Sequence, residues 1–406
     1  MIRKKIVCAL LPLFLCSNAS FLDKTETYNH PVSSVFSSSK AEAVDEIVDE
    51  ISKIKKMTLE EKIGQMFMAH LPAKAWNDDA VLRNFVSDIG GVMYFGDELK
   101  GKTKEEIASM SKKMQNYSKY PLFISADIEG GAVNRIRHLY KLPSAKSYGK
   151  KYDDAKDKKA FLQDFRADAS KLAAVLHELG INMNFAPVLD LECGGTFEDY
   201  GRCYSKEPEI VAKLAGEWIE QLQQEGILTI GKHFPGHGNA DKDSHDGIAC
   251  ITKSIDYINS HDLVPFRKAI EKNISGIMIG YLKTPYDTDN LAPFSKKTID
   301  VLRKQLGYEG LIVSDDLYMP CVRERNHAEM ATEAIKAGID IILEIKANKI
   351  SSIKDRIKKA VENKEIDEKR IDESVYRILK AKKQIDKPKP AGAERAWKPN
   401  AQAKDL

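Results

Sequence analysis

The sequence contains few cysteines and no excess of charge of one sign. Its 406 residues include six cysteines, none of them in a Cys-x-x-Cys pair, so neither a zinc ribbon nor a dithiol redox centre is predicted. The formal net charge is +3, and residues 1–19 account for it through Arg3, Lys4 and Lys5. The rest of the chain lacks the basic surface of a nucleic-acid-binding protein, and no nucleic-acid partner is expected.

Long apolar runs are also scarce, and one of them stands near the N-terminus. Ile6–Leu15 follows basic residues and precedes Ser17-Asn-Ala19, the order found in secretory signal peptides. The run is shorter than the roughly 20 apolar residues that a bilayer-spanning helix needs. We therefore expect cleavage after Ala19, export to the periplasm or the medium, and no membrane span afterwards. Cys16 leaves lipidation open, although Leu15 stands where lipoprotein signals usually carry a small residue.

The remaining chain is expected to form one large domain, because 43% of the residues are apolar and can fill a substantial core. The Ser-rich residues 20–42 are predicted to be a spacer, 43–386 a barrel-shaped catalytic domain, and the Lys-, Pro- and Ala-rich residues 387–406 a disordered tail. In an oxidising compartment Cys193 and Cys203 would close a short disulfide loop, and separate buried thiols are the alternative.

Short apolar runs alternate with helical stretches along this domain. Thr58 and Glu61 form a capping-box pattern that predicts a helix before the first strand. Gly180 and Gly226 are expected to end two amphipathic helices. Further helices are predicted at 350–361 and 366–384. Eight runs qualify as strands, at 64–70, 90–95, 121–129, 182–191, 227–235, 276–282, 310–317 and 339–345.

Strict alternation of strand and helix predicts a parallel sheet with right-handed crossovers. Eight strands are the number in a closed (β/α)8 barrel, but a doubly wound open sheet shows the same alternation. Asp127, Asp190, Lys232 and Asp315 each lie near the end of an apolar run, where a barrel gathers its catalytic groups. We therefore predict an α/β protein with a single TIM-barrel domain.

The densest group of reactive side chains follows the fifth predicted strand. It reads Lys232-His-Phe-Pro-Gly-His-Gly238, then Asp243-Ser-His245-Asp246. On an extended loop Asp243 and His245 point to the same side, so the carboxylate can hold one imidazole nitrogen while the other moves a proton. A polar loop whose histidines only bond the backbone is one alternative. A metal site made of His233, His237 and His245 is another.

Two further motifs carry candidate site residues. Gly310-Leu-Ile-Val-Ser-Asp315-Asp316 ends in two carboxylates, and because adjacent strand residues face opposite ways, we expect only one to face the barrel mouth as a nucleophile. Asp316 is alternatively a helix N-cap. Asp127 and Arg135 offer an acceptor and a forked donor for sugar hydroxyls, or a salt bridge within their loop. Their glycine spacing does not match a phosphate-binding loop, so no nucleotide is predicted.

Taken in order, these motifs resemble those of glycoside hydrolase family 3, and specifically of its β-N-acetylglucosaminidases that act on peptidoglycan fragments. The resemblance extends from Thr58 to the last predicted helix. It rests on Thr58-Leu-Glu-Glu-Lys-Ile-Gly-Gln-Met, Asp127-x-Glu-Gly-Gly, Asn184-Phe-Ala-Pro-Val-Leu-Asp190, Gly201-Arg202-x-Tyr-Ser205, Lys232-His-Phe-Pro-Gly-His-Gly and Ser314-Asp-Asp-Leu.

The resemblance implies a retaining glycosidase with Asp315 as nucleophile, His245 as acid/base and Asp243 as the partner of the histidine. A histidine thus takes the role that a second carboxylate has in most retaining glycosidases. No metal and no cofactor are implied, and the expected partner is a small carbohydrate or muropeptide substrate. The residues implied to bind the N-acetylglucosamine unit are Asp127, Arg135, Arg202, Lys232 and His233.

Some positions depart from the family, and two other functions fit the same residues. Cys203 stands where the family usually has Ser, and Gly280-Tyr281 where Ala-His is common. A phosphorylase would transfer the sugar to phosphate, since a neutral histidine repels an anion less than a carboxylate does. A non-catalytic muropeptide-binding protein would keep the barrel without turnover, against which the joint presence of Asp315, His245 and Asp243 argues.

Overall fold

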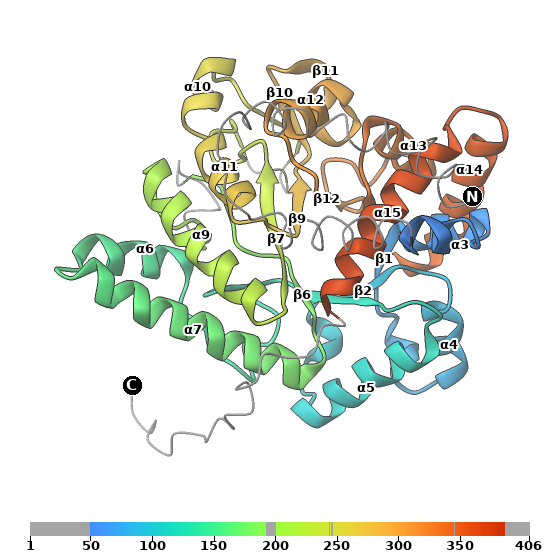
Figure 1. Cartoon of the computed structure of the whole chain (residues 1–406), viewed down its shortest axis with the longest axis horizontal. Coiled ribbons are helices and arrows are strands. Elements are labelled where there is room, and N and C mark those ends of the chain that lie inside the picture. Colours follow the sequence, from blue (N-terminus) through green and yellow to red (C-terminus); the bar gives the residue numbers. More distant parts are fainter. Residues whose placement is uncertain (1–48, 192–199, 243, 245–246, 345, 386–406) are drawn as a thin grey trace, which may run out of the picture.

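The computed structural model describes residues 49–191, 200–242, 244, 247–344 and 346–385, and they form a closed eight-stranded barrel (Figure 1). Each barrel strand pairs in parallel with the next barrel strand in the sequence, and the last closes on the first. The strands are β1 Phe67–His70, β2 Gly91–Tyr94, β3 Phe123–Ala126, β6 Met183–Asn184, β7 Leu228–Phe234, β9 Gly276–Ile279, β12 Leu311–Asp316 and β13 Ile341–Glu344. The predicted (β/α)8 barrel is confirmed, and the open-sheet alternative is wrong.

Helices surround the barrel (Figure 1). Thr58 and Glu61 form the predicted capping box. Gly180 is the predicted C-cap of α7, at φ +70°, and Gly226 follows the C-cap Glu225 of α9 at φ +82°. The helices are α3 Leu59–Gln65, α4 Asp79–Val86, α5 Lys104–Tyr117, α6 Ala145–Asp154, α7 Lys158–Leu179, α9 Pro208–Gln224, α10 Ile255–Ser260, α11 Leu263–Glu271, α12 Lys296–Asp300, α13 His327–Ala337, α14 Ile350–Glu362 and α15 Glu368–Ile385.

The apolar runs are strands because the barrel buries both of their faces. All seven residues of β7 are buried, and Phe67 and Phe123 are fully enclosed by their neighbours. A strand buried on both sides has no polar face, which explains why the sequence shows continuous apolar runs rather than alternation. The polar residues that interrupt these runs stand at the strand ends, and there they form the site described below.

Several predicted strands are longer than the observed ones. The run 182–191 pairs regularly only over Met183–Asn184, because Pro187 has no N–H to donate and only an isolated bridge from Val188 to Lys232 follows. The run 121–129 is divided into β3 and β4 (Ile128–Gly130), and β4 forms a hairpin with β5 (Val133–Asn134). A small sheet of β8 (Ala249–Cys250), β10 (Leu282–Thr284) and β11 (Asp287–Leu291) was not predicted.

The predicted signal peptide (1–19), spacer (20–42) and tail (387–406) lie outside the described residues, as does Cys193 of the predicted disulfide. Its predicted partner Cys203 is buried. Among the residues that the structure describes, no helix combines the length and the apolar character needed to cross a bilayer.

Candidate active site

A pocket of about 530 Å³ opens at the carboxyl ends of the barrel strands. Strands β2, β7, β9, β12 and β13 contribute to its wall, together with the β4–β5 hairpin. Apolar side chains form part of the lining, and Tyr200, 55% exposed, lies at its edge. The polar lining residues are Asp127, Glu129, Arg135, Arg202, Lys232, His233, Asp315 and Asp316.

Lys232 is the centre of a buried charge cluster in this pocket. Its Nζ lies 2.6 Å from Asp127 Oδ1 and 2.6 Å from Glu129 Oε1. Arg202 donates to the two oxygens of Glu129 from Nε and NH2, both at 2.8 Å. Arg135 NH2 lies 3.3 Å from Asp127 Oδ2, and among the described residues its buried Nε has no hydrogen-bond partner. Three cations therefore hold two carboxylates in fixed positions and leave a donor available for a ligand.

These ion pairs keep the cluster charged although it is buried. Burial opposes ionisation of Asp127 and Glu129, but the positive charges around them outweigh it and lower the pKa of both carboxyls. The same attraction raises the pKa of Lys232 and of Arg202 despite their burial. The cluster thus stays ionised across the physiological range and presents strong hydrogen-bonding groups to a polar ligand.

His233 is oriented by a second buried carboxylate, Asp190. The two residues are in contact through His233 Nδ1 and Asp190 Oδ2, 2.7 Å apart. Asp190 also accepts the backbone N–H groups of His233 and His237, at 3.2 and 2.7 Å. Burial opposes its ionisation, yet the charges and donors of the two histidines lower the pKa of Asp190. Since a carboxylate only accepts, His233 Nδ1 carries a proton, and the ring is fixed in one orientation.

Both acids at the end of β12 line the pocket, so the prediction that only one faces the mouth is wrong. Between Val313 and Asp316 the register of β12 against β13 shifts, and the regular alternation of side chains ends there. Asp315 is half-buried, and its Oδ1 accepts from the Asp316 N–H at 2.8 Å. Asp316 is not a helix N-cap either. Its Oδ1 accepts from the Tyr318 N–H, and Asn326 caps the next helix, α13.

Tyr281 stands after β9, in the Gly280-Tyr281 pair that departs from the family, and it contacts the end of β12. It is fully buried, and its hydroxyl donates to the backbone carbonyl of Asp315 at 3.3 Å. Burial and the nearby Asp315 and Asp316 charges raise the pKa of Tyr281 well above 10.0, so the phenol stays protonated and remains a donor. The bulky side chain therefore contributes to the position of the predicted nucleophile.

The predicted acid/base pair, Asp243 and His245, lies outside the described residues. Ser244 between them is buried and contacts His237 Nε2 through Oγ, at 3.0 Å. His245 is also a member of the alternative metal site with His233 and His237, so that alternative stays open too. Within the described ranges, no three His, Cys, Asp or Glu side chains are grouped to hold a metal ion.

The structure brings together the six described residues to which the resemblance assigns a catalytic or sugar-binding role. Asp127, Arg135, Arg202, Lys232, His233 and Asp315 line one pocket. Glu129 and Asp190 received no role from the sequence, although Glu129 accepts from both Arg202 and Lys232 and Asp190 orients His233. The signal for both was present, since each is an acid near the end of a predicted strand.

The barrel and this pocket define the class of the protein. A carboxylate at the end of a strand, surrounded by fixed charged donors and acceptors at the mouth of a (β/α)8 barrel, fits the site of a glycoside hydrolase. Residues 58–381 match the model of the glycosyl hydrolase family 3 N terminal domain. The chain belongs to glycoside hydrolase family 3.

Relatives of known name agree with this assignment. The chain is 34% identical over 258 residues to a beta-hexosaminidase of Nitrosomonas eutropha, which covers 63% of this chain and 73% of that protein. A family 3 beta-N-acetylglucosaminidase from Paenibacillus sp. FPU-7 superimposes with a TM-score of 0.74 at 31% identity, covering 82% of this chain and 64% of that one. LpqI of M. tuberculosis superimposes with a TM-score of 0.71 at 27% identity, covering 82% and 95%. This chain thus spans less than two thirds of the Paenibacillus chain.

Proposed function

We propose that this protein is a retaining β-N-acetylglucosaminidase that removes terminal N-acetylglucosamine from peptidoglycan fragments. The observation that carries the proposal is the presence of Asp315 in the same pocket as the Asp127, Glu129, Arg202 and Lys232 cluster. Such a cluster suits the hydroxyl groups of a sugar ring, because each hydroxyl is both a donor and an acceptor. The names of the N. eutropha and Paenibacillus relatives support a hexosamine as the sugar.

In the first step Asp315 attacks the anomeric carbon while protonated His245 donates its proton to the glycosidic oxygen. The carbon–oxygen bond to the leaving group breaks, and a glycosyl ester of Asp315 forms through an oxocarbenium-like state. In the second step neutral His245 takes a proton from water, whose oxygen attacks the same carbon and releases Asp315. Asp243 would hold the imidazole and stabilise its charged form.

The test is release of nitrophenol from 4-nitrophenyl N-acetyl-β-glucosaminide, with the β-glucoside as the comparison substrate. We expect release from the N-acetyl substrate, insensitive to a chelator, and loss of at least about 10³-fold in kcat for Asp315→Ala. Asp256→Ala, which removes an exposed carboxylate on α10 outside the pocket, is the matched control and should keep wild-type activity. Near-normal turnover by Asp315→Ala would refute the assignment.

Two additions to this assay separate the other functions. Stimulation by phosphate, with a sugar phosphate as the product, would identify a phosphorylase. Inhibition by the chelator would favour the metal site of His233, His237 and His245. Absence of release from both substrates, with retained binding of N-acetylglucosamine, would identify a binding protein.

We also propose that the protein is exported. The support is the order of basic, apolar and small residues within residues 1–19. N-terminal sequencing of protein recovered from cell fractions tests this proposal. A first residue of Ser20 in an exported fraction supports it, and an intact Met1 in the cytoplasmic fraction contradicts it.

A further inference from the structure

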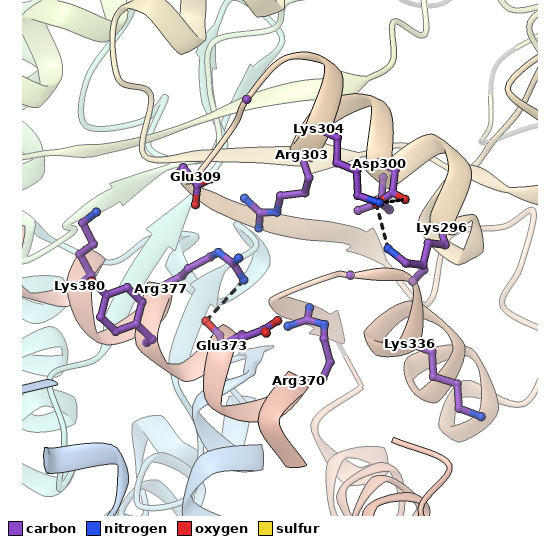
Figure 2. A pocket seen from close by; sticks show the side chains of 15 residues that line it. Lys296, Asp300, Arg303, Lys304, Glu309, Lys336, Arg370, Glu373, Arg377 and Lys380 are labelled. Carbon is purple, nitrogen blue, oxygen red and sulfur yellow. Dashed lines mark hydrogen bonds and ion pairs between the residues drawn. The ribbon is translucent and has the colours of Figure 1, made fainter. Parts of the chain in front are cut away.

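A second cavity, of about 930 Å³, opens on the face of the barrel away from the active site. Figure 2 shows the side chains that line it. Glu309 and Gly338, which line it, precede strands β12 and β13. Asp315, in contrast, stands at the carboxyl end of β12. The cavity therefore lies at the amino ends of the strands, where barrel enzymes do not place their catalytic groups. Its walls come from η5 (Val301–Gln305), α12, α13 and α15.

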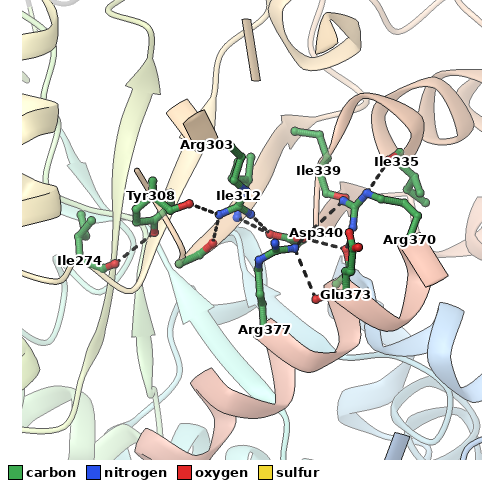
Figure 3. A network of polar contacts seen from close by, with 12 residues as sticks. Ile274, Arg303, Tyr308, Ile312, Ile335, Ile339, Asp340, Arg370, Glu373 and Arg377 are labelled. Atoms are coloured by element: carbon green, nitrogen blue, oxygen red, sulfur yellow. Dashed lines mark hydrogen bonds and ion pairs between the residues drawn. The ribbon is translucent and has the colours of Figure 1, made fainter. Parts of the chain in front are cut away.

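Three arginines converge on one buried carboxylate behind this cavity (Figure 3). Asp340 is completely buried, and its Oδ2 lies 2.5 Å from Arg303 NH2. Its Oδ1 lies 3.2 Å from Arg377 NH1 and 3.5 Å from Arg370 NH2. One negative charge is thus shared by three positive charges, and only 14–21% of each arginine side chain is exposed.

The local excess of positive charge extends over the whole cavity. Seven basic and three acidic side chains line it, so with Asp340 included the excess is three positive charges. Burial together with the neighbouring guanidinium of Arg377 outweighs the attraction of Asp340 and lowers the pKa of Arg303 and of Arg370. A negatively charged ligand in the cavity would relieve this repulsion.

The three arginines differ in how many of their N–H donors remain available to a ligand. Arg303 donates from NH1 to the carbonyls of Tyr308 and Gly310, and Arg370 donates to two further carbonyls. Both side chains are therefore engaged in hydrogen bonds to the backbone around the barrel. Within the described residues, Arg377 makes hydrogen bonds through NH1 only, to Asp340 and to the carbonyl of Glu373. Its Nε and NH2 groups are not used by the described residues.

Lys380 stands three residues after Arg377 on α15, which places both side chains on the same helix face. Figure 2 shows both among the side chains around the cavity. Lys380 is exposed, and it makes no hydrogen bond or ion pair with any described residue. The two residues also line a neighbouring cavity of about 400 Å³, together with Tyr308, so they stand where the two cavities meet.

We propose that this cavity is a second binding site, for a molecule that carries a phosphate group, with Arg377 and Lys380 as its ligands. A guanidinium edge and an ammonium group together match a tetrahedral oxyanion, and a dianion offsets most of the charge excess. The cavity is larger than a phosphate ion and falls in the usual size range of small-molecule sites, so the phosphate is part of a larger molecule. Its source is a soluble phosphate ester or a lipid headgroup.

The test uses the full chain and isothermal titration at constant ionic strength, with the active site saturated by N-acetylglucosamine. The soluble probe is glycerol 3-phosphate, and the lipid probe is a vesicle of phosphatidylcholine with or without phosphatidylglycerol. We expect saturable binding of one of them, weakened about tenfold or more by Lys380→Gln, since charge-assisted hydrogen bonds contribute on that scale. Lys380→Gln leaves the Asp340 network intact, whereas Arg377→Gln removes one of its contacts and serves as the second variant.

Lys369→Gln is the matched control, because it removes the same charge from the same helix at a residue that does not line the cavity. Binding should survive this change, and nitrophenol release should be equal in all three variants and the wild type. Binding of the ester or of the phosphatidylglycerol vesicles supports the proposal and identifies the source. Absence of saturable binding to either probe would overturn it, as would equal affinities of Lys380→Gln and Lys369→Gln.

Discussion

Asp262 carries a buried carboxyl group whose protonation should make the stability of the protein depend on pH. The residue precedes α11 and is only 1% exposed. Its Oδ1 accepts from Asn239 Nδ2 at 2.7 Å, and within the described part of the chain its Oδ2 has no partner. Burial, with the nearby charge of Asp190 adding to it, raises the pKa of Asp262 from 3.8 to about 6.

The sign follows from a folded-state pKa that is higher than the unfolded one. Well below pH 3.8 the carboxyl is protonated in both states, and its favourable contribution to folding is complete. As the pH rises towards 6, the unfolded chain ionises and the folded protein resists, so stability is lost. A difference of about two pKa units corresponds to about 3 kcal/mol of the free energy of unfolding. Asp262→Asn keeps the side chain neutral and removes this loss.

We therefore expect the free energy of unfolding of Asp262→Asn, relative to wild type, to rise by about 2 kcal/mol between pH 4 and pH 7, the larger part of the total. Urea unfolding monitored by tryptophan fluorescence at intervals of one pH unit measures the difference. Asp256→Asn, an exposed change on α10, is the control and should show no such trend. A difference that stays constant with pH, or falls, would refute the reasoning.

Two further substitutions test the buried charge cluster and the left-handed C-cap of α7. Lys232→Met leaves Asp127 and Glu129 without their shared cation, and we expect it to lower the free energy of unfolding by about 3–5 kcal/mol. Lys213→Met, which removes a half-exposed partner of Glu217, should cost no more than about 1 kcal/mol, and equal losses would contradict the argument. Gly180→Ala imposes φ +70° on a residue with a Cβ and places that atom 2.6 Å from Ser111 Cβ. Gly307→Ala is the control, because Gly307 also has a positive φ but has no neighbour within 4 Å, so this change should lower the free energy of unfolding only by the about 1–2 kcal/mol of backbone strain. Gly180→Ala should lower the free energy of unfolding by more than Gly307→Ala when both are measured by urea unfolding. An equal or smaller loss would contradict the argument.

Local sequence patterns predicted most of the fold because local interactions determine those elements. The Thr58 and Glu61 capping box and the left-handed Gly180 each depend on neighbours within a few residues, and both are present as predicted. The apolar runs predicted all eight strands because a barrel strand is buried on both faces. Strand lengths were not predicted, since Pro187 and the break between β3 and β4 after Ala126 end regular pairing in ways that an apolar run does not show.

The candidate site was predicted in part. Arg202 and Lys232 were assigned to sugar binding by resemblance, and the structure places both in the pocket. Their shared partner Glu129 received no role, because it is 73 residues from Arg202 and 103 from Lys232 and no local pattern links them. The two acids of β12 were expected on opposite faces, but the register shift before Asp316 brings both to the pocket.

The sequence by itself determined which segments are helices and strands, that they alternate, and which reactive side chains stand at strand ends. Periodicity, capping and apolar content are local properties, and they can be recognised in the sequence without knowledge of the fold. Only the tertiary structure decided which charges meet. Closure of the barrel brings Lys232 to Asp127 and Glu129, leaves Asp262 buried beside Asp190, and gathers Arg303, Arg370 and Arg377 around Asp340. Electrostatic interactions depend on distance and burial in space, and neither can be measured along the chain.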